Sequence, residues 1–199
     1  MNGKNPYAAM LPLALLGAIL ATFCDAMHVH TATLTYPDPW LFNQAVWVLP
    51  GFFVAFMSMA VAYLWLTRLL PAGLPHETSA SAGDFRSVVE TMTTFALVYL
   101  LSGFGSREPA LLAAVFYIAF VIRLAFTYEK SFLLLTALVL APAGMFAEGA
   151  LAALGLVHYR QPEIYNVPWW LGALYMHGAF ALREAMRFFV YGPRKACPA

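Results

Sequence analysis

Residues 132–157 read FLLLTALVLAPAGMFAEGALAALGLV and contain one ionisable side chain, that of Glu148. A helix needs about 20 predominantly apolar residues to cross a bilayer core of about 30 Å. This stretch exceeds that length, so it predicts a transmembrane helix.

Five more apolar runs of similar character accompany this stretch. Of the 199 residues, 62% are hydrophobic and only 11% are charged, whereas about a quarter of the residues are charged in an ordinary soluble domain. A membrane β-barrel is disfavoured, because its strands alternate apolar and polar residues. The sequence therefore predicts an all-α integral membrane protein, a single domain over residues 1–199. Its six expected transmembrane helices cover residues 10–30, 40–68, 85–104, 110–127, 132–157 and 169–191.

Basic residues predict the orientation in the membrane. An even number of spans places both termini on one side, and nine of the eleven Lys and Arg residues fall on or near that side. These are Lys4, Arg68, Arg86, Arg123, Lys130, Arg183, Arg187, Arg194 and Lys195. The positive-inside rule then predicts that both termini are cytoplasmic. A bacterial inner membrane is the expected location, or the endoplasmic reticulum if the chain is eukaryotic.

Proline and small residues predict features within the helices. Pro50-Gly51 and Pro142-x-Gly144 fall inside expected helices, where each predicts a kink. The sequence also contains small residues spaced four apart, which let another helix approach closely. These pairs are Gly17 and Ala21, Ala143 and Ala147, Gly149 and Ala153, and Ala181 and Ala185. Such faces also suit contacts between copies, so a homo-oligomer is expected.

Ionisable residues inside the expected helices indicate a candidate site, because each is costly in a bilayer. Asp25 and His28 lie three apart, Glu148 lies in the fifth helix and His177 in the sixth. Counted from the expected outer ends, Asp25, Glu148 and His177 lie about 8, 14 and 12 Å deep at helical rise. This agreement predicts an inward polar patch that receives a ligand's head group. The alternative is that each residue bonds a neighbouring helix or reaches toward the interface.

Other chemistries find little support in the sequence. The ligand types Asp25, His28 and His30 suit a metal, but His30 points away from the other two on a helix. Cys24 and Cys197 have no neighbours that suggest a disulfide or a nucleophile. No GxSxG motif or phosphate-binding loop occurs. The sequence therefore predicts no metal, no cofactor and no catalytic residue, and the net charge of +1 suggests no nucleic-acid partner.

Charged residues at the end of the last expected helix and before the third expected helix predict a membrane anchor and a helix cap. Arg183, Glu184 and Arg187 lie at the end of the last expected helix, where positive charge suits anchoring at an anionic inner leaflet. Asp84 ends the longest expected loop, which begins at Pro71, and predicts an N-cap for the third helix.

A series of motifs in order along the chain resembles the Insig (insulin-induced gene) family. The residues that carry the resemblance are Leu16-Gly17, Asp25, His28, Tyr36-Pro37-Asp38, Trp47, Pro50, the stretch 126–131, Gly155, His158 to Glu163, Tyr165, Trp169 and Gly192-Pro193-Arg194. The resemblance implies six transmembrane helices around an internal lipid-binding cavity, with both ends cytoplasmic and no catalytic activity. Eukaryotic members bind oxysterols and retain the escort protein SCAP, or the reductase of sterol synthesis, in the endoplasmic reticulum.

This chain departs from the family at its polar residues. It has Asp25 and His28 where the family mostly has Asn and Gln, and Arg outnumbers Lys eight to three, which is common in GC-rich bacterial genomes. A bacterial relative would have no SCAP. The lipid-binding part of the family role is therefore expected to transfer, and a membrane-protein partner is expected only if the regulatory role transfers too.

The leading hypothesis is a non-enzymatic lipid-binding or lipid-sensing membrane protein that holds a sterol or a diacylglycerol-like neutral lipid. The candidate lipid-binding residues are Asp25, His28, Trp47, Pro50, Tyr99, Glu148 and His177. Two alternatives remain open: an enzyme acting on lipids with the same carboxylates and histidines, and a small proton-coupled transporter.

Overall fold

The computed structural model describes residues 5–70 and 74–194, so Lys4, Pro71, Lys195 and Cys197 lie outside the described residues. The helices are α1 (Pro6–His30), α2 (Val48–Leu69), α3 (Phe85–Gly105), α4 (Pro109–Ala125), α5 (Lys130–Ala153) and α6 (Trp170–Ala185). A π-helical segment, η2 (Met186–Val190), continues α6, and a 3-10 turn, η1 (Leu41–Asn43), precedes α2. Two short strands, β1 (Leu34–Thr35) and β2 (His158–Tyr159), pair antiparallel.

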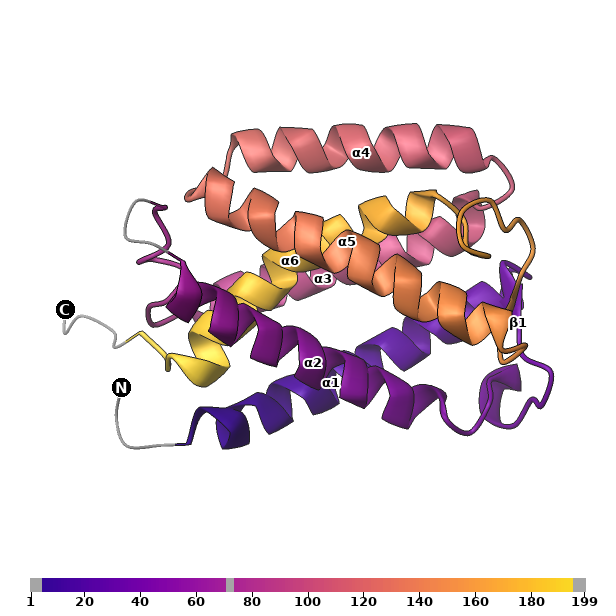
Figure 1. Cartoon of the computed structure of the whole chain (residues 1–199), viewed down its shortest axis with the longest axis horizontal. Helices are drawn as coiled ribbons and strands as arrows, with labels where there is room; N and C mark the ends of the chain where they lie inside the picture. Colours follow the sequence, from indigo (N-terminus) through magenta and orange to yellow (C-terminus); the bar gives the residue numbers. More distant parts are fainter. Residues whose placement is uncertain (1–4, 71–73, 195–199) are drawn as a thin grey trace.

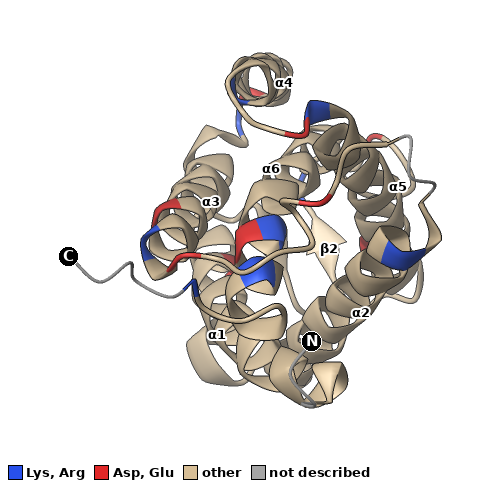
Figure 2. Ribbon diagram, turned by 90° about the vertical axis from the view of Figure 1, so that its left-hand side faces the viewer, with Lys and Arg blue, Asp and Glu red and all other residues tan. Residues whose placement is uncertain are grey.

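The helices form a bundle around α6 (Figure 1). Helix α6 packs against α3, α4 and α5, while α1 packs against α2 and α3. Helices α2 and α5 make few backbone contacts with each other, and α4 lies at the edge of the bundle (Figure 2). The beginning of α1 and the end of α6 lie at the same end of the bundle, opposite the end that carries β1 (Figure 1).

The outer surface of the bundle is apolar. Four helices, α1, α2, α3 and α5, are long and apolar enough to cross a membrane, and α4 is a shorter apolar helix. Large side chains such as Ile19, Ile118 and Phe146 are 52%, 60% and 69% exposed. Monomeric soluble proteins rarely expose continuous apolar surface of this kind. The chain is therefore a multi-pass membrane protein.

Helix α2 begins later than the sequence predicted. Residues 40–47 form an irregular segment, with Phe42 and Asn43 in the left-handed region at φ 54° and 58°. Pro50 consequently lies in the first turn of α2, where backbone N–H groups have no helical partner and proline costs little. The predicted kink at Pro50-Gly51 is wrong for this reason. Pro142 lies within α5 as predicted.

The last two helices also end differently from the prediction. The fifth expected helix extended to residue 157, but α5 ends at Ala153, and Gly155 then takes a φ of +72°. Glycine in this region is a common way to end a helix. The α-helical part of α6 ends at Ala185, and η2 carries the chain to Val190.

Close helix contacts occur at Gly17, which belongs to a predicted small-residue pair, and at Gly144, which was predicted only as part of a kink. A Cβ atom on Gly17 would lie 2.9 Å from the ring of Phe56, so α1 and α2 approach closely there. A Cβ atom on Gly144 would overlap the ring of Tyr175, and this contact joins α5 to α6.

The charged end of α6 is buried. Arg183, Glu184 and Arg187 are 3%, 3% and 4% exposed. Glu184 pairs with Arg183 Nε at 3.0 Å and with Arg187 Nη1 at 2.8 Å, and the Arg183 guanidinium lies 3.9 Å from the ring centre of Tyr128. The prediction that these residues anchor the chain at the leaflet surface is wrong, because the α4–α5 connection and the segment before α3 cover them.

The segment before α3 is held by Glu129 and ends in an N-cap. The Glu129 carboxylate accepts hydrogen bonds from the Thr78 and Ser79 amides, both at 2.8 Å. Asp84 accepts a hydrogen bond from the Ser87 amide, which confirms the predicted N-cap.

Candidate functional site

Asp25 of α1 lies in the interior near the β1 end of the bundle and is 2% exposed. Its Oδ2 accepts hydrogen bonds from the Tyr36 hydroxyl at 2.8 Å and from Gln44 Nε2 at 2.7 Å. Gln44 follows the left-handed turn at Phe42 and Asn43, and that turn directs the buried Gln44 side chain inward. Strained backbone of this kind persists only where its surroundings hold it in place.

Glu148 of α5 has a matching set of hydroxyl partners. Its Oε2 accepts a hydrogen bond from Tyr159 at 2.8 Å and its Oε1 accepts one from Tyr175 at 3.0 Å. Tyr159 is placed by the pairing of β2 with β1, in which it lies opposite Leu34. The carboxylates of Asp25 and Glu148 lie close enough to interact electrostatically, and within the described residues neither pairs with a Lys or Arg side chain.

Two of these tyrosines lie in connections outside the helices. Burial raises the pKa values of Tyr36 and Tyr159 well above the ordinary value of tyrosine, and the nearby carboxylates raise both pKa values further. Both hydroxyl groups therefore remain protonated hydrogen-bond donors at any physiological pH.

Tyr99 lies beside the two carboxyl groups and their partners, and His28 packs against the Tyr99 ring. The His28 ring lies 4.9 Å from the ring of Tyr99, and its Nε2 lies 2.7 Å from Ser102 Oγ. The Tyr99 hydroxyl lies in the neighbourhood of both carboxyl groups. We refer to this set as the polar cluster: Asp25, Tyr36, Gln44, Tyr99, Glu148, Tyr159 and Tyr175.

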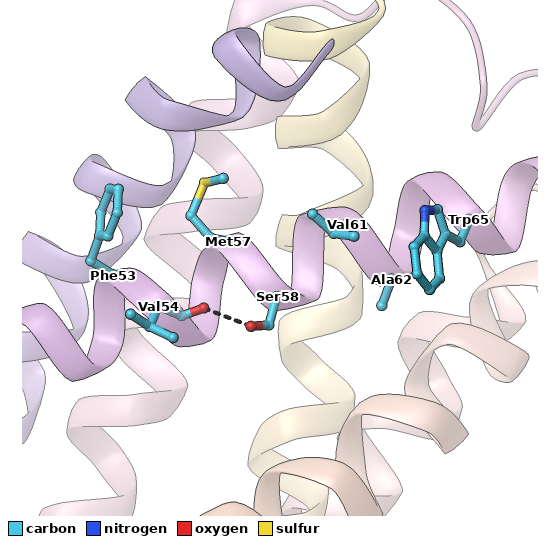
Figure 3. Close-up of a pocket in the computed structure, with 7 residues that line it drawn as sticks. All are labelled: Phe53, Val54, Met57, Ser58, Val61, Ala62 and Trp65. Atoms are coloured by element: carbon cyan, nitrogen blue, oxygen red, sulfur yellow. Dashed lines mark hydrogen bonds between the residues drawn. The ribbon is translucent and has the colours of Figure 1, made fainter.

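An apolar groove lies along α2, and its second part lies between α2 and α5. Its first part has a volume of about 400 Å³ and is formed by α2 side chains from Phe53 to Trp65, as Figure 3 shows. The hydroxyl of Ser58 bonds the Val54 carbonyl of its own helix at 2.8 Å (Figure 3). It is therefore satisfied within α2, and no charged residue lines this part.

The second part of the groove has a volume of about 210 Å³ and continues to Leu69. It adds Thr136, Val139 and Leu140 of α5, with Leu182 of α6. Both parts share Ala62 and Trp65, so we treat them as one α2–α5 groove. From Phe53 to Leu69, α2 rises about 24 Å.

The remaining predicted site residues lie in several places. Trp47 packs edge-on against Tyr36 at 5.6 Å and so borders the polar cluster. Pro50 is exposed on the first turn of α2.

His177 lies on another face of α6 and does not join the polar cluster. Its Nε2 lies 3.0 Å from the Phe116 carbonyl and its Nδ1 lies 2.8 Å from Arg123 Nη1. A carbonyl can only accept and a guanidinium can only donate. These bonds therefore fix Nε2–H as the tautomer and join α6 to α4.

The sequence predicted Asp25 and Glu148 but missed their partners. Tyr36, Gln44 and Tyr159 lie in connections between helices, where polar residues are ordinary. A signal was present at Tyr36, which belongs to the turn motif that carried the family resemblance.

No family model and no curated protein matches the sequence. Among solved structures, the mycobacterial Insig homolog MvINS from Mycobacterium vanbaalenii has a TM-score of 0.75 at 21% identity, and the match covers 98% of this chain and 100% of MvINS. The chain has the fold of an Insig homolog. The resemblance found in the sequence is thus confirmed at the level of the fold.

A second structure of the same relative also matches this Insig-like chain. It is a cross-linked trimer of a cysteine variant of MvINS, with a TM-score of 0.70 at 22% identity. The match covers 94% of this chain and 96% of the other.

Proposed function

We propose that this Insig-like protein is a non-enzymatic membrane receptor for a mostly apolar lipid with a small head group, the class that includes sterols and diacylglycerols. The head group would meet the polar cluster and the hydrocarbon would lie in the α2–α5 groove. The observation that carries this proposal is the presence of one buried carboxyl group, Asp25, and one half-buried carboxyl group, Glu148, both bonded by hydroxyl groups, on the same bundle as a long apolar groove.

The dimensions support a lipid rather than a small soluble ligand. The groove is apolar and runs for about 24 Å along α2, which is most of the hydrocarbon thickness of a bilayer. Phe52 and Phe56, near the beginning of α2, pack in the same hydrophobic cluster as Tyr36 and Tyr99. The polar cluster therefore lies near one end of the groove, as a lipid with a single head group requires.

The orientation in the membrane belongs to the same proposal. Six spans with both termini in the cytoplasm would place Arg68, Arg86 and Lys130 on the cytoplasmic side, with Arg107 and Arg160 outside. The exposure of all five side chains supports this arrangement, because the positive-inside rule concerns charges in short loops and near helix ends. The polar cluster would then lie in the outer half of the membrane.

Association between copies is also part of the proposal. The cross-linked trimer of MvINS and the exposed apolar faces of α1 and α4 support a homo-oligomer.

Filling the groove is expected to remove the lipid. Ala62 is exposed and lines both parts of the groove, so in Ala62→Phe the ring would occupy the space for the hydrocarbon. Lipids that copurify with the protein would be extracted and quantified by mass spectrometry. We expect one small-headed lipid class to be enriched with the wild type and to fall several-fold with Ala62→Phe.

The control is Leu15→Phe, at a half-exposed position on α1. It should leave the copurified lipid unchanged. A wild-type lipid profile equal to that of the detergent-extracted membrane would refute the receptor proposal.

A further inference from the structure

His76 lies in the segment before α3 and contacts two helices. Its Nε2 lies 3.1 Å from the Thr67 carbonyl of α2, and its Nδ1 lies 2.6 Å from the Leu74 carbonyl. Its ring stacks on that of Phe132 in α5, with the ring centres 5.8 Å apart and the planes 29° apart. Phe132 lies one turn before Thr136, which lines the second part of the groove. His76 therefore joins α2 to α5 beside the end of the α2–α5 groove.

The two carbonyl groups determine which protonation state of His76 satisfies this geometry. A carbonyl oxygen only accepts hydrogen bonds, and a neutral imidazole carries a single N–H group. Only the imidazolium form can donate to the Thr67 and Leu74 carbonyls at the same time. In the neutral form, one ring nitrogen would direct its lone pair at a carbonyl oxygen, and that contact would be repulsive.

Two neighbours of the His76 ring favour a positive charge on it. Thr67 lies in the last turn of α2, where carbonyl groups lack helical partners and the helix dipole stabilises a cation. The face of an aromatic ring such as Phe132 also attracts a cation within about 6 Å. His76 is only half-buried, so water can accept the proton when the ring loses it.

No charged side chain bonds the His76 ring within the part of the chain that the structure describes. Histidine is the one side chain that ordinarily changes charge between pH 5 and 8. The titratable groups on the elements around it are Tyr63 and Arg68 of α2, Glu77 beside it, Glu129 and Lys130 at the start of α5, and Tyr191, whose hydroxyl lies 2.8 Å from Thr67 Oγ1.

We propose that His76 is a pH-sensitive contact, which in its protonated form fastens the segment before α3 to the end of α2. The contact is complete at low pH. As the pH rises, loss of the proton to water removes one of the two hydrogen bonds and frees the beginning of the segment. This inference goes beyond the proposed function and requires no bound lipid.

The amides that follow His76 report whether the segment is held. The Thr78 and Ser79 amides bond the Glu129 carboxylate, and the Ala80 amide donates to the His76 carbonyl at 2.9 Å. All three should exchange slowly with deuterium while the segment is fastened, and faster once it is freed.

Hydrogen–deuterium exchange of residues 78–80, followed by mass spectrometry, tests the inference. Wild type and His76→Gln are compared in the same nanodiscs at about pH 5.5 and at about pH 8, near the two limits of ordinary histidine titration. The intrinsic effect of pH on exchange cancels in each ratio of variant to wild type. A hydrogen bond from a charged donor is about twice as strong as a neutral one. We expect His76→Gln to exchange about tenfold faster than the wild type at the lower pH, which corresponds to about 1.4 kcal/mol, and the ratio to fall to near one at the higher pH.

Two further variants separate the causes. His76→Phe keeps a ring that can stack on Phe132 but donates no hydrogen bond, so it should exchange as fast as His76→Gln. His158→Gln removes an exposed histidine from β2, at the opposite end of the bundle, and should exchange like the wild type at both pH values.

A ratio of His76→Gln to wild type that is the same at both pH values, whatever its size, would overturn the inference. Wild-type exchange in His76→Phe at the lower pH would overturn it as well, because stacking alone would then hold the segment. So would a loss of protection in His158→Gln equal to that in His76→Gln.

Discussion

Glu184→Ala is expected to lower the free energy of unfolding by about 3–5 kcal/mol, because it removes one partner of a buried ion-pair network. Glu184 is the carboxylate shared by Arg183 and Arg187, and both arginines are nearly inaccessible to water. Without Glu184, two guanidinium groups would stay buried beside Tyr128 with no counter-charge. Unfolding of the detergent-solubilised protein with SDS, followed by circular dichroism, measures the effect.

Glu90→Ala is the matched control, because Glu90 is exposed and makes no ion pair in the described residues. Its change should remain within about 0.5 kcal/mol, as for most surface substitutions. If the two variants lose equal stability, Glu184 does not hold this end of the bundle together.

Gly144→Ala is expected to destabilise the protein by about 1–3 kcal/mol, the usual range for added volume in a packed interior. The new Cβ atom would overlap the Tyr175 ring, so α5 and α6 would have to separate or the ring would have to turn away. Either change breaks the hydrogen bond from Tyr175 to Glu148. Lipid retention should therefore fall together with stability, and both can be measured on one preparation.

The neighbouring position gives a demanding comparison for Gly144→Ala. Ala143 is exposed on the same helix, so Ala143→Leu adds far more volume but places it toward lipid. We expect Ala143→Leu to be nearly neutral in both measurements. A larger loss with Ala143→Leu than with Gly144→Ala would show that the α5–α6 contact is not as tight as described.

The helical architecture could be predicted because a bilayer imposes a simple rule on sequence. Every spanning backbone must satisfy its own hydrogen bonds, so long apolar runs become helices. The beginning of α2 could not be predicted in this way. Residues 40–47 are apolar enough to continue the helix. The left-handed turn at Phe42 and Asn43 instead places Gln44 against Asp25, and this tertiary contact leaves no pattern in the local sequence.

The candidate site could be predicted only in part for a similar reason. Ionisable residues inside apolar runs are conspicuous, and depth along the helices grouped Asp25 with Glu148, which lie near each other in the structure. Depth carries no information about which way a helix face points, so His177 was grouped with them although it faces Arg123 on α4. Arg183 and Arg187 show the same limit, because basic residues at a helix end have the same pattern whether a loop covers them or lipid surrounds them.

The central claim is that a lipid lies along α2 with its head group at the polar cluster. Photo-crosslinking tests this claim most directly. A single-chain lipid carrying a diazirine in its tail would be incorporated into nanodiscs with the wild-type protein, and labelled peptides would be mapped by mass spectrometry. The receptor proposal predicts labelling concentrated between Phe53 and Leu69 of α2 and between Thr136 and Leu140 of α5, with competition by excess unlabelled lipid. Equal labelling of Leu15 and Ile118 on the outer faces, without competition, would contradict it.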